Sequence, residues 1–74
     1  MINEELIIDG KKFQLIGVPN SDGEIFLSCD IEVWWRGELA DLQKAIYECG
    51  KANTITCHKS DIPFIRAMFE VSHV

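Results

Sequence analysis

The chain has few basic residues for its number of acidic ones. Its 74 residues include 7 Lys and Arg against 12 Asp and Glu, which gives a formal net charge of −5 at pH 7. Binding to nucleic-acid phosphates needs clustered Lys and Arg, whereas here the basic residues are scattered and Lys11-Lys12 is the one adjacent pair. Direct nucleic-acid binding is therefore not expected. The alternative that the acidic surface mimics DNA has little support, because the acidic residues are scattered as well.

The chain also lacks a long apolar run and a basic N-terminus. No stretch approaches the length that crosses a bilayer, and Met-Ile-Asn-Glu-Glu is acidic where a secretory signal would be basic. The apolar fraction of 47% indicates a folded chain rather than a disordered one. These observations predict one cytoplasmic domain over residues 1–74, with no membrane partner and, at this size, little stability to spare.

Closely spaced metal ligands are absent too. Cys29, Cys49 and Cys57 lie far apart, whereas zinc sites usually contain close pairs such as Cys-x2-Cys. Adjacent Cys57 and His58 would point to opposite sides of a strand. Buried, reduced cysteines are the simpler interpretation, so no metal or cofactor is expected. The alternative is a small metal- or thiol-dependent enzyme that uses Cys57, His58 and His73.

Other catalytic signatures are missing. The chain contains no glycine-rich phosphate loop, nucleophile elbow or dinucleotide fingerprint. Asp30 and Glu32 share a face of a predicted strand, but two carboxylates in that position more often form a solvated sheet surface. No catalytic residue is therefore assigned, and the chain is not expected to be an enzyme.

The strongest pattern in the sequence is a strand that leads into a helix. Apolar residues alternate from Glu24 to Trp35, which predicts a single central strand with one buried face. Residues Glu38–Cys49 then switch to helical spacing, and Gly50 predicts a helix end in the left-handed conformation. The apolar stripe of this helix consists of Leu39, Leu42, Ile46 and Cys49.

The N-terminal part predicts a hairpin. Asp9-Gly10 is a favoured two-residue turn between Glu4–Ile8 and Lys11–Val18. If Ile8 faces Lys11, the apolar residues of the two strands share one face: Leu6, Ile8, Phe13 and Leu15. The simplest continuation is a three-stranded antiparallel meander with the central strand. Thr54–His58 predicts a fourth strand, expected to lie parallel to the central strand after a right-handed crossover.

Residues Phe64–Val71 fit either a helix or a strand, and Pro63 with the helix-favouring residues that follow favours the helix. Such a helix is expected to bury Phe64, Met68 and Phe69. The predicted fold is therefore α+β, a small single domain in the order β-β-β-α-β-α. Its sheet is mostly antiparallel, and the Glu38–Cys49 helix packs on one face.

Several apolar residues remain on the outer face of this predicted sheet: Ile7, Ile16, Val18, Phe26 and Trp34. Such a face is expected to be covered by the C-terminus or by a second chain. Alternation points Trp35 into the core and Trp34 outward beside Arg36, and exposed Trp and Arg are typical anchors of protein interfaces. Packing of Trp34 beneath the C-terminal helix fits the pattern equally well.

The sequence therefore predicts a small acidic domain that acts by protein–protein interaction. The partner is another protein or a second copy of the chain. An inhibitor or accessory factor of the phage or mobile-element type is suggested by the size alone and by no motif. The predicted interaction residues are Trp34, Phe26, Arg36, Val18 and Ile16.

Overall fold

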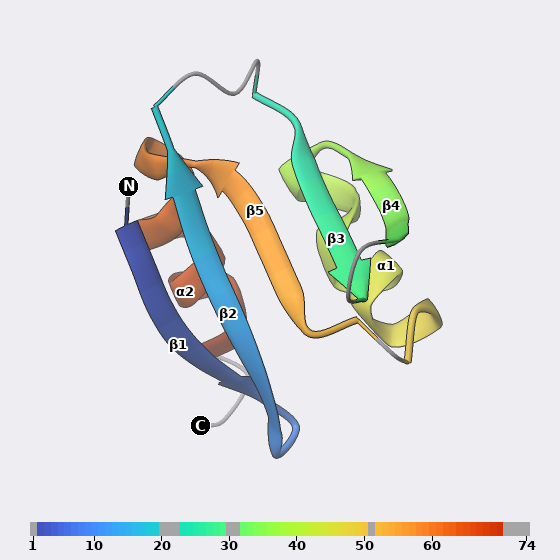
Figure 1. The fold of residues 1–74 in the computed structure, drawn as a ribbon. Helices are drawn as coiled ribbons and strands as arrows, with labels where there is room; N and C mark the ends of the chain where they lie inside the picture. Colours follow the sequence, from blue (N-terminus) through green and yellow to red (C-terminus); the bar gives the residue numbers. More distant parts are fainter. Residues whose placement is uncertain (1, 20–22, 30–31, 51, 71–74) are drawn as a thin grey trace.

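The computed structural model describes residues 2–19, 23–29, 32–50 and 52–70, without the side chains of residues 29 and 32–34. The described residues form strands and helices in one α+β domain (Figure 1). In chain order the elements are β1 (Ile2–Ile8), β2 (Lys11–Val18), β3 (Ile25–Cys29), β4 (Glu32–Gly37), α1 (Leu39–Glu48), β5 (Thr54–His58), the short 3-10 helix η1 (Lys59–Asp61) and α2 (Ile62–Glu70).

The five strands form one mixed sheet in the order β1-β2-β5-β3-β4. Only β2 and β5 pair in parallel, and the other three neighbouring pairs are antiparallel. The α+β class and the mostly antiparallel sheet are thus confirmed. The predicted meander is wrong, because β5 inserts between β2 and β3. The strand that leads into α1 is β4, and β5 runs parallel to it because both are antiparallel to β3. The parallel orientation predicted for β5 is therefore confirmed for the β4 part of the predicted central strand and wrong for the β3 part.

The central strand predicted from Glu24 to Trp35 is two strands. β3 and β4 are antiparallel neighbours, with Leu27 opposite Trp35 and an irregular register between Leu27 and Ser28. The period-2 pattern of the sequence runs unbroken from one strand into the next, so it conceals the reversal. The reversal itself, at residues 30 and 31, lies outside the described residues.

The β1–β2 hairpin is confirmed in register. Ile8 pairs with Lys11 and Leu6 with Phe13. The turn residues Asp9 and Gly10 have φ of 50° and 80°. Positive φ at both positions defines the type I′ turn, whose twist matches that of the strands it joins. This local match of turn and alternation explains why the hairpin was predictable.

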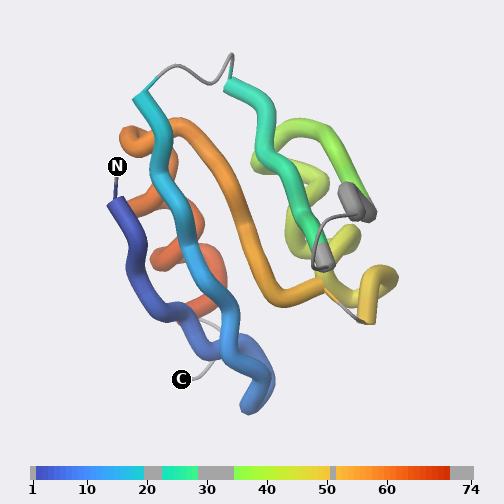
Figure 2. The backbone as a smooth tube through the Cα atoms, in the orientation of Figure 1, coloured from blue at the N-terminus to red at the C-terminus, as the bar shows by residue number. Residues whose placement is uncertain are grey.

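Both helices pack on the same face of the sheet, α1 behind β3 and β4 and α2 behind β1 and β2 (Figures 1 and 2). The buried side chains of this face and the two helices form one core: Leu6, Ile8, Phe13, Leu15, Ile25, Leu27, Leu42, Ala45, Ile46, Ala52, Ile55, Cys57, Ile62, Ile65 and Phe69. The helices and the sheet therefore form two layers.

Helix α1 is confirmed within a residue or two, with Leu42 and Ile46 of its predicted stripe buried. Its end differs from the prediction. Cys49 N–H donates to the Ala45 carbonyl at 2.8 Å, and Gly50 is not among the described residues with positive φ. The helix thus ends without the left-handed glycine that the sequence suggested.

Helix α2 confirms the helical alternative for the C-terminal segment. It buries Ile62, Ile65 and Phe69. Phe64, which was expected to be buried, is 62% exposed. Gly17 on β2 permits the close approach of this region, because an added Cβ would lie 2.6 Å from Ile62 Cδ1 and 2.9 Å from Lys59 Cα. The missing side chain at Gly17 therefore fixes where η1 and the start of α2 rest on the sheet.

Candidate protein-binding face

The side of the sheet opposite the two helices is the candidate site. In β2, β5 and β3, the core side chains Leu15, Ile55 and Leu27 are fully buried. Successive side chains in a strand point to opposite faces, so the next residue in each strand points away from the helices. We call this surface the open face. In the described part of the chain it consists of Asn3, Glu5, Ile7, Lys12, Gln14, Ile16, Val18, Phe26, Ser28, Arg36, Thr54, Thr56 and His58.

One row of paired residues crosses the whole open face. Asn3 on β1 pairs with Ile16 on β2, and Ile16 pairs with Thr56 on β5. Thr56 also pairs with Phe26 on β3, and Phe26 with Arg36 on β4. Directly paired residues have Cβ atoms about 5 Å apart, so these five side chains form a continuous strip. We call them the Phe26 row.

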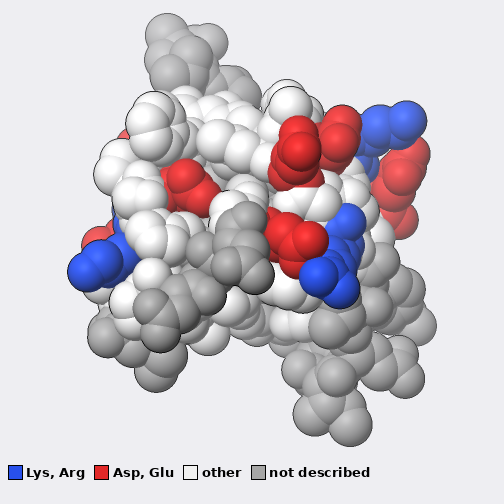
Figure 3. Space-filling view, turned by 90° about the horizontal axis from the view of Figure 1, so that it is seen from above, with Lys and Arg blue, Asp and Glu red and all other residues white. Residues whose placement is uncertain are grey.

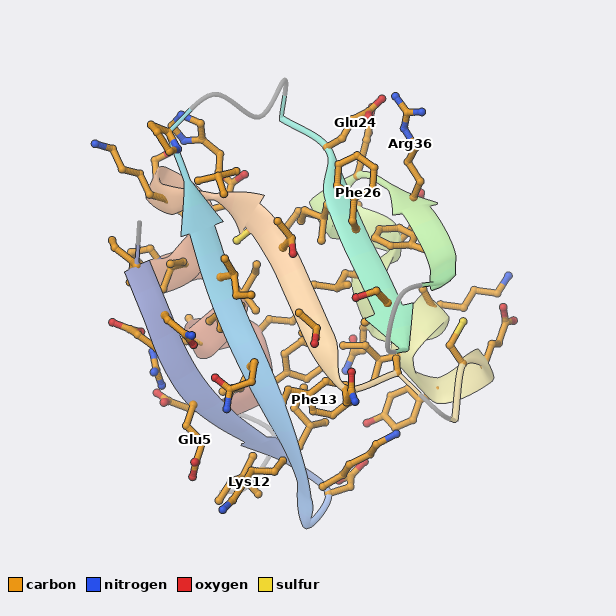
Figure 4. All side chains as sticks on the ribbon, in the orientation of Figure 1. Glu5, Lys12, Phe13, Glu24, Phe26 and Arg36 are labelled. Carbon is orange, nitrogen blue, oxygen red and sulfur yellow. The ribbon has the colours of Figure 1, made fainter. Side chains whose placement is uncertain are left out.

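One end of the Phe26 row is held by charge. The Arg36 guanidinium lies 5.4 Å from the centre of the Phe26 ring, and Arg36 Nε donates to Glu24 Oε2 at 2.6 Å. Figure 4 shows these three side chains together at one end of β3 and β4. An arginine over an aromatic face is attracted by the ring's quadrupole. The contacts therefore orient both Arg36 and Phe26 on the open face.

The structure brings together most of the residues predicted for interaction. Ile16, Phe26 and Arg36 belong to the Phe26 row, and Val18 lies next to it, paired with His58. All four come from strands, and Ile16, Val18 and Phe26 are half-buried rather than fully exposed.

The two tryptophans differ in what the structure describes. Trp35 packs against the core, as predicted. The side chain of Trp34 lies outside the described residues, so its orientation stays a prediction. Helix α2 packs behind β1 and β2, near one edge of the sheet. Trp34 belongs to β4, which forms the opposite edge (Figure 1).

The charges described on the open face are paired. Lys12 Nζ lies 3.7 Å from Glu5 Oε2 on the neighbouring strand. This pair and the Glu24–Arg36 pair lie at opposite corners of the sheet (Figure 4). In the view from above, acidic and basic side chains lie beside one another in the same way (Figure 3). The view therefore gives no sign of a basic surface for phosphates.

Cys57 and His58 lie on opposite sides of β5, as predicted. Cys57 is completely buried in the core, and His58 is on the open face. His58 Nδ1 accepts a hydrogen bond from Ser60 N–H at 3.2 Å, which caps η1. His73 lies outside the described residues, and no cluster of His, Cys, Asp and Glu among those described could hold a metal ion. Cys57 and His58 are therefore not arranged as ligands of one ion.

The thiol of Cys57 is held in its protonated form. Burial, with a smaller contribution from the negative charge of Asp61, raises the pKa of this thiol from 9.0 to about 11. A nucleophilic cysteine needs the opposite shift, because the thiolate is the reactive species. The surroundings of Cys57 favour a core residue rather than a nucleophile.

This burial predicts a protected thiol. In a Cys29→Ser/Cys49→Ser background, Cys57 is expected to react with a disulfide reagent only after the chain is unfolded by urea. The pKa of the Cys57 thiol is higher in the folded chain than in the unfolded chain. The contribution of this thiol to the free energy of unfolding is therefore complete below pH 9.0 and is lost as the pH rises toward about 11. Urea unfolding of this background and of its Cys57→Ala derivative isolates that loss. Rapid reaction of the native thiol would contradict the assignment.

A mainly apolar hollow lies at the turn end of the hairpin, away from the Phe26 row. It has a volume of about 200 Å³ and is lined by Ile8, Asp9, Lys11, Phe13, Ile46, Tyr47 and Gly50. Lys11 Nζ crosses its rim to donate to the Gly50 carbonyl at 2.6 Å. This hydrogen bond links the hairpin to the chain just after α1.

Among the residues of the site that were not singled out from the sequence, Thr56 and Glu24 matter most for its geometry. Thr56 connects Ile16 with Phe26, and this depends on the position of β5 between two strands that precede it in the chain. Glu24 anchors Arg36, and the signal for that pair was available: a hairpin across residues 25–37 would have placed the two side chains at the same end.

Comparison with known proteins finds no matching family model, no similar curated protein and no similar solved structure. Within the described residues, no helix has the length and apolar character that a membrane crossing requires. The chemistry of the surface therefore carries the functional argument.

Proposed function

We propose that the chain is a protein-binding domain and that its partner contacts the open face. The observation that carries this proposal is the placement of both helices on one side of the sheet. It leaves Ile16 and Phe26 in a row on the other side, with Arg36 stacked on the ring. Aromatic and arginine side chains set among neutral residues are typical of the energetic centre of an interface.

The surface around the Phe26 row suits a flat protein partner. Thr54, Thr56 and Ser28 place small hydroxyl groups beside the apolar side chains, and hydroxyls can donate or accept hydrogen bonds. The paired charges at two corners leave the centre neutral. A role as an inhibitor or accessory factor, and a cytoplasmic setting, stay predictions that rest on size and composition.

A pair of cross-linking positions tests this proposal. A photoreactive residue at Thr56, on the open face, is expected to capture a partner protein in cells of the source organism. The same residue at Gln43, exposed on α1 and therefore in the other layer, is the matched control. Capture from Gln43 alone would contradict the proposal, and capture of a second copy from Thr56 would identify the partner as the chain itself.

The captured partner then permits a quantitative test. Phe26→Ala is expected to weaken the purified complex by about 30-fold or more, which corresponds to the roughly 2 kcal/mol lost at an interface anchor. Tyr47→Ala, at an exposed aromatic residue of α1, is expected to leave the affinity unchanged. Calorimetric titration measures both. Equal affinities of wild type and Phe26→Ala would show that the partner binds elsewhere.

A further inference from the structure

Strand β1 lies at one edge of the sheet, where its outward backbone groups could pair with another strand. The two-residue turn closes on the Ile8–Lys11 pair, and hydrogen-bonded pairs then alternate along an antiparallel ladder. Asn3, Glu5 and Ile7 consequently point their N–H and C=O groups away from β2. Gln14 on β2, the residue opposite Glu5, supports this orientation. Its N–H points away from β1 and donates to the Asn53 carbonyl at 2.9 Å.

This edge has features that favour strand addition. β1 is 7 residues long, and Ile7 is 52% exposed. Long, exposed and partly apolar edge strands are templates for pairing between chains unless something blocks them. The block must therefore be sought among the groups that contact β1.

Arg66 of α2 supplies such a block. Its Nη2 donates to the Glu5 carbonyl at 3.1 Å, one of the outward groups at the middle of β1. Its Nε donates to Glu4 Oε2 at 2.6 Å, and its Nη1 lies 3.4 Å from Glu70 Oε1. The hydrogen bond to Glu4 is the main reason that the pKa of Arg66 is raised above its ordinary value, and with the attraction of Glu4 and Glu70 it outweighs the lowering effect of burial. The guanidinium thus stays charged and fixed across the edge.

For an incoming strand, the Glu5 carbonyl at the middle of β1 would already be occupied by the hydrogen bond from Arg66. The strand would have to displace Arg66 from Glu5 or leave one of its own N–H groups unpaired within the ladder, and both cost free energy. The carboxylates of Glu4, Glu5 and Glu70 outnumber Arg66 and Lys12, the cations that pair with them, and the remaining negative charge opposes the approach of a second copy.

We propose that Arg66 closes the edge of β1 to strand addition, and that the strand it excludes is β1 of a second copy of the chain. A two-fold axis beside β1 makes the two copies of β1 antiparallel, and Asn3, Glu5 and Ile7 then offer matching donors and acceptors to themselves. Every copy presents this edge at the concentration of the protein. The edge is a different surface from the open face, so this inference goes beyond the proposed function.

A double substitution that leaves the net charge unchanged tests the role of Arg66. The double variant Glu4→Gln/Arg66→Gln removes one acidic and one basic group, so the net charge stays at −5. It is expected to double its apparent mass by light scattering as concentration rises, and more readily at high salt, which screens the remaining repulsion between copies. Glu70→Gln is the matched control, because it removes the weaker partner of Arg66 and leaves the Glu5 contact in place; its mass is expected to match that of wild type.

Backbone hydrogen exchange distinguishes edge pairing from any association through the open face. The amides of Asn3, Glu5 and Ile7 are expected to exchange rapidly in wild type and to become protected in the associated double variant. Adding Ile7→Pro, which removes an outward N–H without breaking the ladder to β2, is expected to restore the wild-type mass. A double variant that keeps its circular dichroism spectrum and stays monomeric, or a wild type in which these amides are protected, would overturn the proposal.

Discussion

Replacing Phe69 by Ala is expected to lower the free energy of unfolding by ~3–5 kcal/mol. The Phe69 ring is 1% exposed and lies in the shared core, so its removal leaves a cavity between α2 and the sheet. A domain of this size has on the order of 5 kcal/mol of stability, so much of the protein should be unfolded at room temperature. Urea denaturation followed by circular dichroism measures the loss.

Phe64→Ala is the control for that experiment, because it makes the same chemical change in the same helix at a side chain that is 62% exposed. Its effect is expected to be about 0.5 kcal/mol or less. A larger loss from Phe64→Ala than from Phe69→Ala would mean that α2 presents its opposite side to the core.

The second large effect is expected on β2, where neighbouring residues belong to different faces. Leu15→Asn should destabilise the chain by ~2–5 kcal/mol through the lost burial alone, and further because it places an amide in an apolar core. Leu15 is fully buried, and its register partners Glu4 and Ile55 hold it in the middle of the sheet. Thermal unfolding of the variant measures the loss.

Ile16→Asn is the matched change one residue along. Its side chain is half-buried on the open face, so the loss should be well below that of Leu15→Asn. Equal losses at the two positions would contradict the assignment of one covered and one open face.

The parts of the fold that were predictable from the sequence are local. The hairpin is specified by Asp9-Gly10 together with the alternation beside it, and α1 by the spacing of Leu42 and Ile46. For the hairpin, the turn residues and the apolar pattern lie within a few residues of one another, and for α1 the apolar spacing alone was sufficient. Such signals do not depend on the arrangement of the rest of the chain.

The order of the strands was not predictable in this way. Placing β5 between β2 and β3 depends on contacts between residues that are far apart in the chain, such as Ile16 with Thr56. The reversal between β3 and β4 was missed because the alternation in the sequence runs unbroken from Ile25 to Trp35. The core face was nevertheless assigned correctly for β1 and β2, since a period of two fixes the face of a strand whichever strand pairs with it.

The candidate site divides along the same line. Its members on single strands, such as Phe26 and Ile16, were identified from alternation. Their arrangement in one row through Thr56 was not identified. Outside the site, the contact of Arg66 with Glu4 was missed for the same reason, because it joins residues 62 positions apart. Local patterns identify which side chains are available, whereas the topology decides which of them meet.

The helices cover one face of the sheet and leave the other accessible. Methyl NMR of isoleucine in the presence of a soluble paramagnetic agent measures this directly at each position. Strong broadening is expected at Ile7, clear broadening at Ile16, and none at Ile25, Ile55 and Ile65, which are fully buried. Protection of Ile16 equal to that of Ile55 in dilute protein would contradict this expectation, because the open face would then be covered within the chain itself.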